Sequence, residues 1–195
     1  MKKHNPKIIL ASTSPRRREL MALLGVPFEA IASDYEEDMT MALAPERLIK
    51  VLSQGKADAV SKNHPGAIVV AADTFVVFKH LSLGKPKNKG EAIKMLKLLS
   101  GKSVAILTGL TVQRLKPKKK IFKSVKTTVH FRSMKIDEIK AYVDSGEPLD
   151  KAGSFAVQGL GAMFIDRLDG EFTGAMGLPL NALIKSLREF RIKVP

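Results

Sequence analysis

The spacing of apolar residues along the chain alternates between two periods, and each period predicts a different kind of element. Stripes with the 3.6-residue period of an amphipathic helix, together with caps at their ends, predict helices over residues 15–24, 45–61, 88–99, 136–143 and 179–190. Apolar runs and stretches with the two-residue period of a strand predict strands over residues 7–11, 28–32, 67–72, 74–78, 104–115 and 121–132. The order begins βαβαβα and ends in long antiparallel strands, which indicates the α/β class.

Two breaks in this pattern carry predictions of their own. Asp73 separates the apolar run that ends at Ala72 from the one that begins at Thr74, so we expect the strand to be interrupted there. The segment 162–176, AMFIDRLDGEFTGAM, is predicted to be a hairpin that turns at 169–170, because Asp-Gly is a preferred two-residue hairpin turn.

The composition is that of an ordinary globular protein, with 195 residues of which 45% are hydrophobic and 27% charged. No repeat, low-complexity linker or clean boundary divides the chain, which predicts a single domain, 1–195, with two lobes. The absence of cysteine excludes disulfides, thiol catalysis and thiolate metal sites. The apolar runs are too short for a membrane span or a signal peptide, so we expect a cytoplasmic protein with no membrane partner.

The formal net charge of +14 is open to two interpretations: a lysine-rich solvated surface, or a polyanionic ligand such as a nucleotide, a nucleic acid or a membrane surface. Surfaces that stack bases need aromatic side chains beside the basic ones. Aromatic residues make up only 6% of this chain, and the densest basic run, Lys116–Lys120, contains none. We therefore expect this run to be an exposed hairpin tip, and nucleic acid is disfavoured as a partner.

The stretch LASTSPRRREL, residues 10–20, combines standard helix-entry chemistry with an unfavourable charge. Ser14 stands at the N-cap and Pro15 at the first helical position. The next three residues, 16–18, are arginines, which the positive end of the helix dipole repels. A bound anion reverses that penalty, because free backbone N–H groups and guanidinium groups then converge on it. The stretch favours a phosphate site, the alternative being that the arginines extend into solvent.

Asp73, the acidic cluster at 34–38 and Gln158 are further candidates for catalytic or binding residues. An aspartate inside an apolar strand run is costly unless it is paired, metal-bound or protonated, so Asp73 is either a satisfied structural residue or a metal ligand or general base. The acidic cluster at 34–38 is either a solvated loop or a source of Mg²⁺ ligands beside a phosphate. Gln158 lies among glycines and offers a donor and an acceptor to a base edge.

Other catalytic patterns are absent from the sequence. It contains no P-loop and no nucleophile elbow. The four histidines have no metal-ligand spacing, and we interpret them as surface or strand residues: His4, His64, His80 and His130.

Taken together, these stretches resemble the Maf family of nucleoside triphosphate pyrophosphatases. The matching pieces follow the family's order over essentially the whole chain: LASTSPRRREL, AADT at 71–74, LGKP at 83–86, EPLDKAGSFAVQGLGAMF from 147 and MGLPL from 176. The resemblance implies an inosine-triphosphate-pyrophosphatase-like α/β fold, with a long mixed sheet, two lobes and a central cleft. It also implies cleavage of a nucleoside triphosphate to the monophosphate and pyrophosphate with a divalent cation, Mg²⁺ or Mn²⁺.

The resemblance assigns roles residue by residue. Asp73 is implied to be the catalytic base and a metal ligand, Glu36 the other essential carboxylate and metal ligand, and Lys56 and Lys85 the lysines that face the phosphates. The triphosphate is assigned to Ser14, Arg16 and Arg17. The branch that hydrolyses dTTP and UTP has Arg, Thr and Gln at three discriminating positions, which are here Arg16, Thr74 and Gln158.

The family further implies a homodimer and a house-cleaning role with a link to cell-division arrest. Two rival functions come from other classes. One is a basic nucleic-acid-binding module, supported by the net charge. The other is a regulatory protein that inhibits septum formation by holding a partner.

Overall fold

Seven strands form one sheet in the order β2-β1-β3-β5-β6-β7, with β4 paired to β3. The computed structural model describes residues 6–38, 41–79 and 81–194, so His4 and His80 lie outside the described residues. The strands are β1 (Ile8–Ala11), β2 (Glu29–Ile31), β3 (Ile68–Phe78), β4 (Leu81–Leu83), β5 (Ser103–Arg114), β6 (Lys119–Phe131) and β7 (Ile165–Asp169). The helices are α1 (Pro15–Ala22), α2 (Pro45–Asn63), α3 (Lys89–Leu99), α4 (Ile136–Asp144), α5 (Phe172–Ala175) and α6 (Leu180–Glu189), and three 3-10 turns are η1 (Glu147–Asp150), η2 (Ala152–Ser154) and η3 (Gly159–Phe164).

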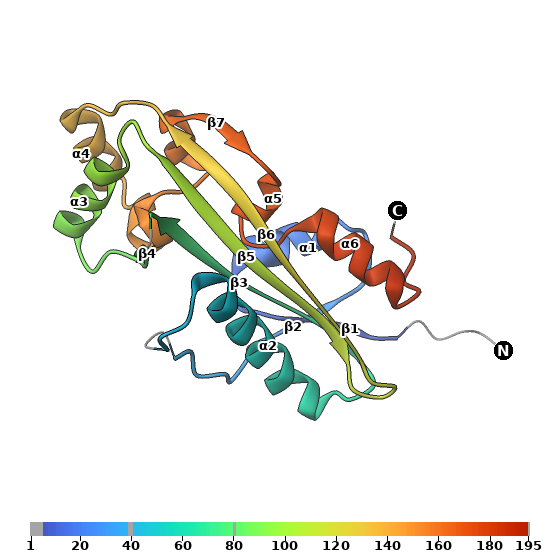
Figure 1. Cartoon of the computed structure of the whole chain (residues 1–195). Helices are drawn as coiled ribbons and strands as arrows, with labels where there is room; N and C mark the ends of the chain where they lie inside the picture. The colour runs from blue at the N-terminus through green and yellow to red at the C-terminus, as the bar shows by residue number, and fades with distance from the viewer. Residues whose placement is uncertain (1–5, 39–40, 80, 195) are drawn as a thin grey trace. The chain divides into compact units, whose positions relative to one another are not determined.

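The sheet is mixed, as expected for the α/β class. Strand β1 runs parallel to both β2 and β3, whereas β4 is antiparallel to β3 and β7 is antiparallel to β6. Figure 1 shows the long strands β5 and β6 joined by a tight turn, and Lys116, Pro117 and Lys118 in that turn are exposed, as predicted for the tip. Among the described residues, no helix is long and apolar enough to span a membrane.

The chain divides into two compact units. Unit 1 comprises the described residues of Met1–Thr74, Thr108–Val125 and Gly177–Pro195, and unit 2 comprises those of Phe75–Leu107 and Lys126–Met176. The prediction of a single domain over 1–195 stays a prediction.

In unit 1, helix α2 packs on β1 and β3 through small residues. Alternate strand positions and one helix stripe make this cluster: Ile9, Ala11, Ala57, Val60, Ala67, Val69 and Ala71. Helix α2 also lies close to β5, because a Cβ at Gly109 would come within 2.8 Å of the Ile49 carbonyl oxygen. The sequence predicts an apolar face of Leu48, Val51, Leu52 and Ala59 for this helix. Leu48 and Leu52 are buried, whereas Val51 is 37% exposed and Lys56 is buried in addition. Because Lys56 is buried, it needs negatively charged partners, and these come from other segments of the chain.

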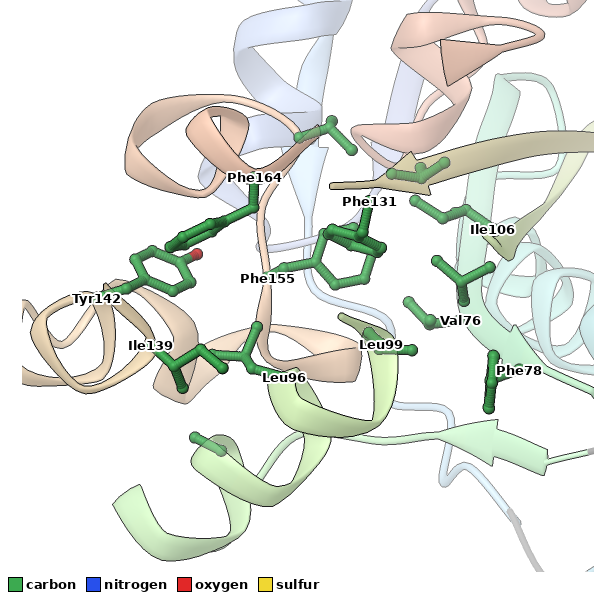
Figure 2. Close-up of a cluster of buried hydrophobic side chains, with 14 of the residues drawn as sticks. Val76, Phe78, Leu96, Leu99, Ile106, Phe131, Ile139, Tyr142, Phe155 and Phe164 are labelled. Carbon is green, nitrogen blue, oxygen red and sulfur yellow. The ribbon is translucent and has the colours of Figure 1, made fainter. Parts of the chain in front are cut away.

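In unit 2, helices α3 and α4 cover a separate aromatic core (Figure 2). Phe131 of β6 meets Phe155 edge to face, with 4.8 Å between the ring centroids. Tyr142 of α4 meets Phe164 in the same manner at 5.3 Å. Such edge contacts stabilise the core beyond the burial of the rings.

Two predictions made from breaks in the pattern are wrong. Strand β3 continues through Asp73 without interruption, because its buried carboxylate is paired rather than turned to solvent. The Asp169–Gly170 pair does not make a hairpin: β7 ends at Asp169 and pairs with β6, and the following residues form the short helix α5. Gly170 has a φ of +124°, and a side chain there would press on the Lys126 carbonyl oxygen.

Candidate functional site

Lys56 of α2 lies between two carboxylates in unit 1. Its Nζ donates to Asp73 Oδ1 at 2.8 Å and forms an ion pair with Glu37 Oε1, also at 2.8 Å. The side chains of Lys56 and Asp73 are each 9% exposed, whereas that of Glu37 is 42% exposed. Charges as buried as the first two are costly unless paired, so these contacts offset a cost of burial as well as forming a candidate site.

The second oxygen of Asp73 has no such partner. Asp73 Oδ2 is buried and accepts no hydrogen bond from any described residue. A buried carboxylate oxygen without a donor is rare in native proteins and calls for an explanation. A cation, a water molecule or a substrate group at this oxygen would supply it.

Asp73 and Glu37 together fit the ligand chemistry of Mg²⁺. That ion is usually held by one or two carboxylates, with water and substrate phosphates completing its coordination. The fit rests on the unpartnered Oδ2 of Asp73 and on the convergence of both carboxylates at Lys56. Within the described ranges, no group of three His, Cys, Asp or Glu side chains could hold a metal by itself.

Arg17 turns inward from the first turn of α1. The Ser14 hydroxyl caps that turn by accepting from Arg17 N at 3.5 Å. The Arg17 guanidinium donates from Nε to the Gly177 carbonyl oxygen at 2.9 Å and from Nη2 to Thr74 Oγ1 at 3.4 Å. Desolvation lowers the pKa of Arg17 from its ordinary value, and the negative charge of Asp73 opposes that effect.

Asp73 and Thr74 serve two different faces of the sheet. Consecutive residues of a strand point to opposite faces. Asp73 meets Lys56 from α2, whereas Thr74 meets Arg17 from α1 and shares a 3.0 Å hydrogen bond with Thr108. Both lie just past the carboxyl end of β1, which is paired with β3 only as far as Val70. Between β1 and β3 the connections diverge to opposite faces, the place where open α/β sheets bind their ligands.

The remaining predicted residues of the arginine stretch have different surroundings. Arg16 is half-buried and makes no hydrogen bond or ion pair with any described residue, so its guanidinium is available to a ligand. Arg18 is exposed. The three arginines therefore divide between one that holds the loop at Gly177 and two whose charge is not neutralised locally.

Lys85 and Gln158 belong to unit 2, whereas the other predicted site residues belong to unit 1. Lys85 follows β4 and is exposed, and Gln158 is half-buried immediately before η3. Neither of them makes a hydrogen bond or ion pair within the described part of the chain.

The loop that carries Gln158 is held by Tyr142 and Glu147. Glu147 accepts hydrogen bonds from the backbone N–H groups of Leu160 and Gly161, each at 2.9 Å, and from the Tyr142 hydroxyl at 2.9 Å. The same hydroxyl accepts from Ala156 N at 3.3 Å. The pair therefore holds the backbone on both sides of position 158.

The two members of this pair respond oppositely to their surroundings. Burial disfavours the charged form of Glu147, but the backbone donors and the Tyr142 hydroxyl outweigh it and hold the Glu147 pKa below its ordinary value. Burial, followed by the hydrogen bond to Glu147, raises the pKa of the Tyr142 hydroxyl.

The sequence directed attention to Glu36, but the contact to Lys56 comes from Glu37. Glu36 is exposed and has no hydrogen bond or ion pair with a described residue. The sequence interpretation also missed the Gly177 carbonyl, Thr108 and the Tyr142–Glu147 pair. Glu147 and Gly177 lie within matching stretches, whereas Thr108 and Tyr142 lie outside them and had no sequence signal.

The sheet makes this an α/β protein, and the carboxylate–lysine cluster and the arginine-bearing helix start beside the end of β1 have the chemistry that fits a phosphorylated ligand. Comparison with known proteins makes the assignment narrower. The family described as Maf-like protein matches residues 7–190. The chain belongs to this family.

Several curated relatives cover nearly the whole chain. The dTTP/UTP pyrophosphatase of Bacillus anthracis (strain CDC 684 / NRRL 3495) is 44% identical over 188 residues, which are 96% of this chain and 97% of the relative. The dTTP/UTP pyrophosphatase of Bacillus cereus (strain AH820) matches at the same identity and coverage. That of Bacillus mycoides (strain KBAB4) is 42% identical over 94% of this chain and 95% of its own length.

Proposed function

We propose that this protein is a nucleoside triphosphate pyrophosphatase that hydrolyses dTTP and UTP to the nucleoside monophosphate and pyrophosphate. The observation that carries the proposal is the buried Lys56–Asp73 pair, in which one carboxylate oxygen has no hydrogen-bond partner among the described residues. The substrate is taken from the names of the relatives, whose sequences match this chain over almost its full length.

The reaction is an in-line attack of water on the α-phosphorus. The bond from that phosphorus to the bridging oxygen breaks, and pyrophosphate leaves. Catalysis of this kind depends mainly on positioning and charge neutralisation. Asp73 Oδ2 orients the water and takes its proton, while Lys56 holds Asp73 Oδ1 by a hydrogen bond and neutralises charge on the phosphates.

The acidic segment supplies the second carboxylate. The sequence resemblance favours Glu36 for this role, and the ion pair with Lys56 favours Glu37. Together with Asp73, the glutamate would hold Mg²⁺ or Mn²⁺. When bound there, the cation would supply charge neutralisation at the phosphate oxygens and lower the pKa of bound water.

The arginine stretch and unit 2 complete the proposed assignments. Arg16 and the N-terminal backbone of α1 at Ser14 bind the triphosphate, and Arg17 orients that helix start through Gly177 and Thr74. Lys85 faces the leaving pyrophosphate. Thr74 and Gln158 discriminate the pyrimidine, as the resemblance implies.

The test is a release assay. Purified protein, Mg²⁺ or Mn²⁺ and a panel of nucleoside triphosphates are incubated, and pyrophosphate is distinguished from orthophosphate. We expect pyrophosphate and monophosphate, preferentially from dTTP and UTP. Orthophosphate as the main product, or no turnover of any triphosphate, would contradict the proposal.

The rival of a nucleic-acid-binding surface loses part of its charge in the structure. At the start of β6, Lys120 pairs with Asp58 and Lys119 pairs with Glu189, so these lysines are engaged within the protein. A cytoplasmic location stays a prediction from the short apolar runs, and a homodimer stays a prediction from the resemblance.

A further inference from the structure

Helix α2 has a glycine in its interior, at position 55, directly before Lys56. Apart from proline, glycine is the poorest helix former, so its presence there needs a reason. A Cβ at Gly55 would lie 2.3 Å from both Cε2 and Cζ of Tyr35 and 2.8 Å from Cδ2. The tyrosine ring therefore lies directly against the helix backbone, in a place that any side chain would occupy.

The position of this ring bears on the candidate site. Tyr35 and Glu37 are two residues apart in a segment without helix or strand, and both contact α2. Tyr35 reaches Gly55 while Glu37 reaches Lys56, which are neighbours on α2. Glu36, between the two, is exposed. The position of the Tyr35 ring thus decides which glutamate contacts Lys56.

The ion pair could not hold the segment by itself. Lys56 is buried but Glu37 is 42% exposed, so water and salt reach the glutamate and screen part of the attraction. A half-buried aromatic ring on a glycine contributes apolar contact that salt does not screen. It is also a rigid anchor, since Tyr has few rotatable bonds.

We propose that Tyr35, seated on Gly55, is a positioning residue that holds the acidic segment 34–38 so that Glu37 meets Lys56 beside Asp73. The inference rests on the proposed function and deepens it, because it assigns a residue to the placement of the second carboxylate. It predicts that disturbing the ring lowers turnover and weakens the apparent affinity for the divalent cation.

A double-mutant cycle tests the coupling. We expect Gly55→Ala and Tyr35→Ala each to lower kcat/KM by about tenfold and to raise the Mg²⁺ concentration needed for half-maximal rate. The double variant should be no worse than Tyr35→Ala alone, and Tyr35→Phe should retain wild-type behaviour. In the Tyr35→Ala background, Gly55→Ala should raise the melting temperature, because alanine favours helix once the ring is gone.

A fluorescence measurement tests the same contact without activity. The chain has no tryptophan and two tyrosines, and Tyr142 is only 3% exposed, so acrylamide quenches mainly Tyr35. We expect Gly55→Ala to increase quenching of the tyrosine emission. Gly66→Ala is the matched control, since a Cβ there meets nothing within 4 Å, and it should leave quenching unchanged.

The outcomes separate the two proposals. Unchanged quenching in Gly55→Ala, or losses of kcat/KM that simply multiply in the double variant, would overturn the positioning role. If the wild-type protein released no pyrophosphate, the proposed function would be refuted. Increased quenching in Gly55→Ala would still show that the Tyr35 ring packs on Gly55.

Discussion

Asp73 divides its two oxygens between different tasks. One accepts from Lys56 and the other has no partner among the described residues. An asparagine would keep an acceptor for Lys56 but could neither take a proton from water nor balance the buried charge. We expect Asp73→Asn to lower kcat by about 10²- to 10⁴-fold while the fold persists, as measured by pyrophosphate release and circular dichroism.

The matched control is Asp58→Asn, which makes the same substitution at an aspartate of α2 that pairs with Lys120 at the surface. It should leave kcat unchanged. An Asp73→Asn variant with wild-type kcat would remove this residue from the mechanism.

The two adjacent glutamates offer a direct comparison between sequence and structure. Glu37 contacts Lys56 and Glu36 does not. We therefore expect Glu37→Gln to lower kcat/KM more than Glu36→Gln does, in assays at saturating Mg²⁺. The reverse order would restore Glu36 to the role that the resemblance gives it.

At the scale of elements, the distance between α2 and the sheet is set by the close packing of the helix on β5. Gly109 of β5 allows close approach, since a Cβ there would lie 2.8 Å from the Ile49 carbonyl oxygen and 2.9 Å from Cγ1. We expect Gly109→Ala to destabilise the protein by about 1–3 kcal/mol, the usual cost of overpacking, and to lower activity by moving α2.

Urea unfolding would measure the loss at Gly109, with Gly66→Ala as the control because its surroundings are open. Equal stability of the two variants would show that α2 does not depend on the close approach.

The loop from η1 to η3 depends on one carboxylate, Glu147. Its pKa lies below the ordinary 4.5, so its contribution to stability is fully present above pH 4.5 and is lost as the pH falls through the lower folded-state value. We expect Glu147→Gln to be less stable than wild type at pH 7, and the gap to shrink below pH 4.5. Urea titrations at several pH values would measure it, and a gap independent of pH would contradict the assignment.

The elements themselves were largely predictable, whereas the site was not. The ends of α1 and α3 follow from local signals, Ser14 and Pro15 at one and Asn88 at the other, and both caps form as predicted. The Asp169–Gly170 turn failed because pairing of β7 with β6 overrode a local preference. The buried face of α2 was predicted only in part: Leu48 and Leu52 are buried as expected, but periodicity treats Lys56 as polar and cannot anticipate its carboxylate partners.

At the scale of the whole molecule, the proposed ligand should act as a stabiliser. A ligand that binds only the folded state adds about 2.7 kcal/mol at one hundred times its Kd, or roughly 5–10 °C in Tm for a chain of this size. The Asp73→Asn variant is used for thermal unfolding, because it should hydrolyse UTP only slowly. We expect UTP with Mg²⁺ to raise the Tm of this variant. Uridine is the control, and an equal shift by uridine would exclude the triphosphate as the source.

Whole-chain resemblance gave the family and the substrate class, and the comparisons confirm the family. Contacts between residues far apart could not be read from composition or spacing. Thr74 with Thr108, and Glu147 with Gly161, depend on how the chain folds back on itself.

The hydrogen bond from Arg17 to Gly177 has a consequence for biosynthesis. Its two residues are 160 positions apart, so the carbonyl leaves the ribosome roughly 10–30 seconds after the arginine at usual rates of translation. Until then the helix start has three cations and lacks the acceptor that orients one of them. A nascent chain therefore cannot form this contact of the proposed site before translation is almost finished.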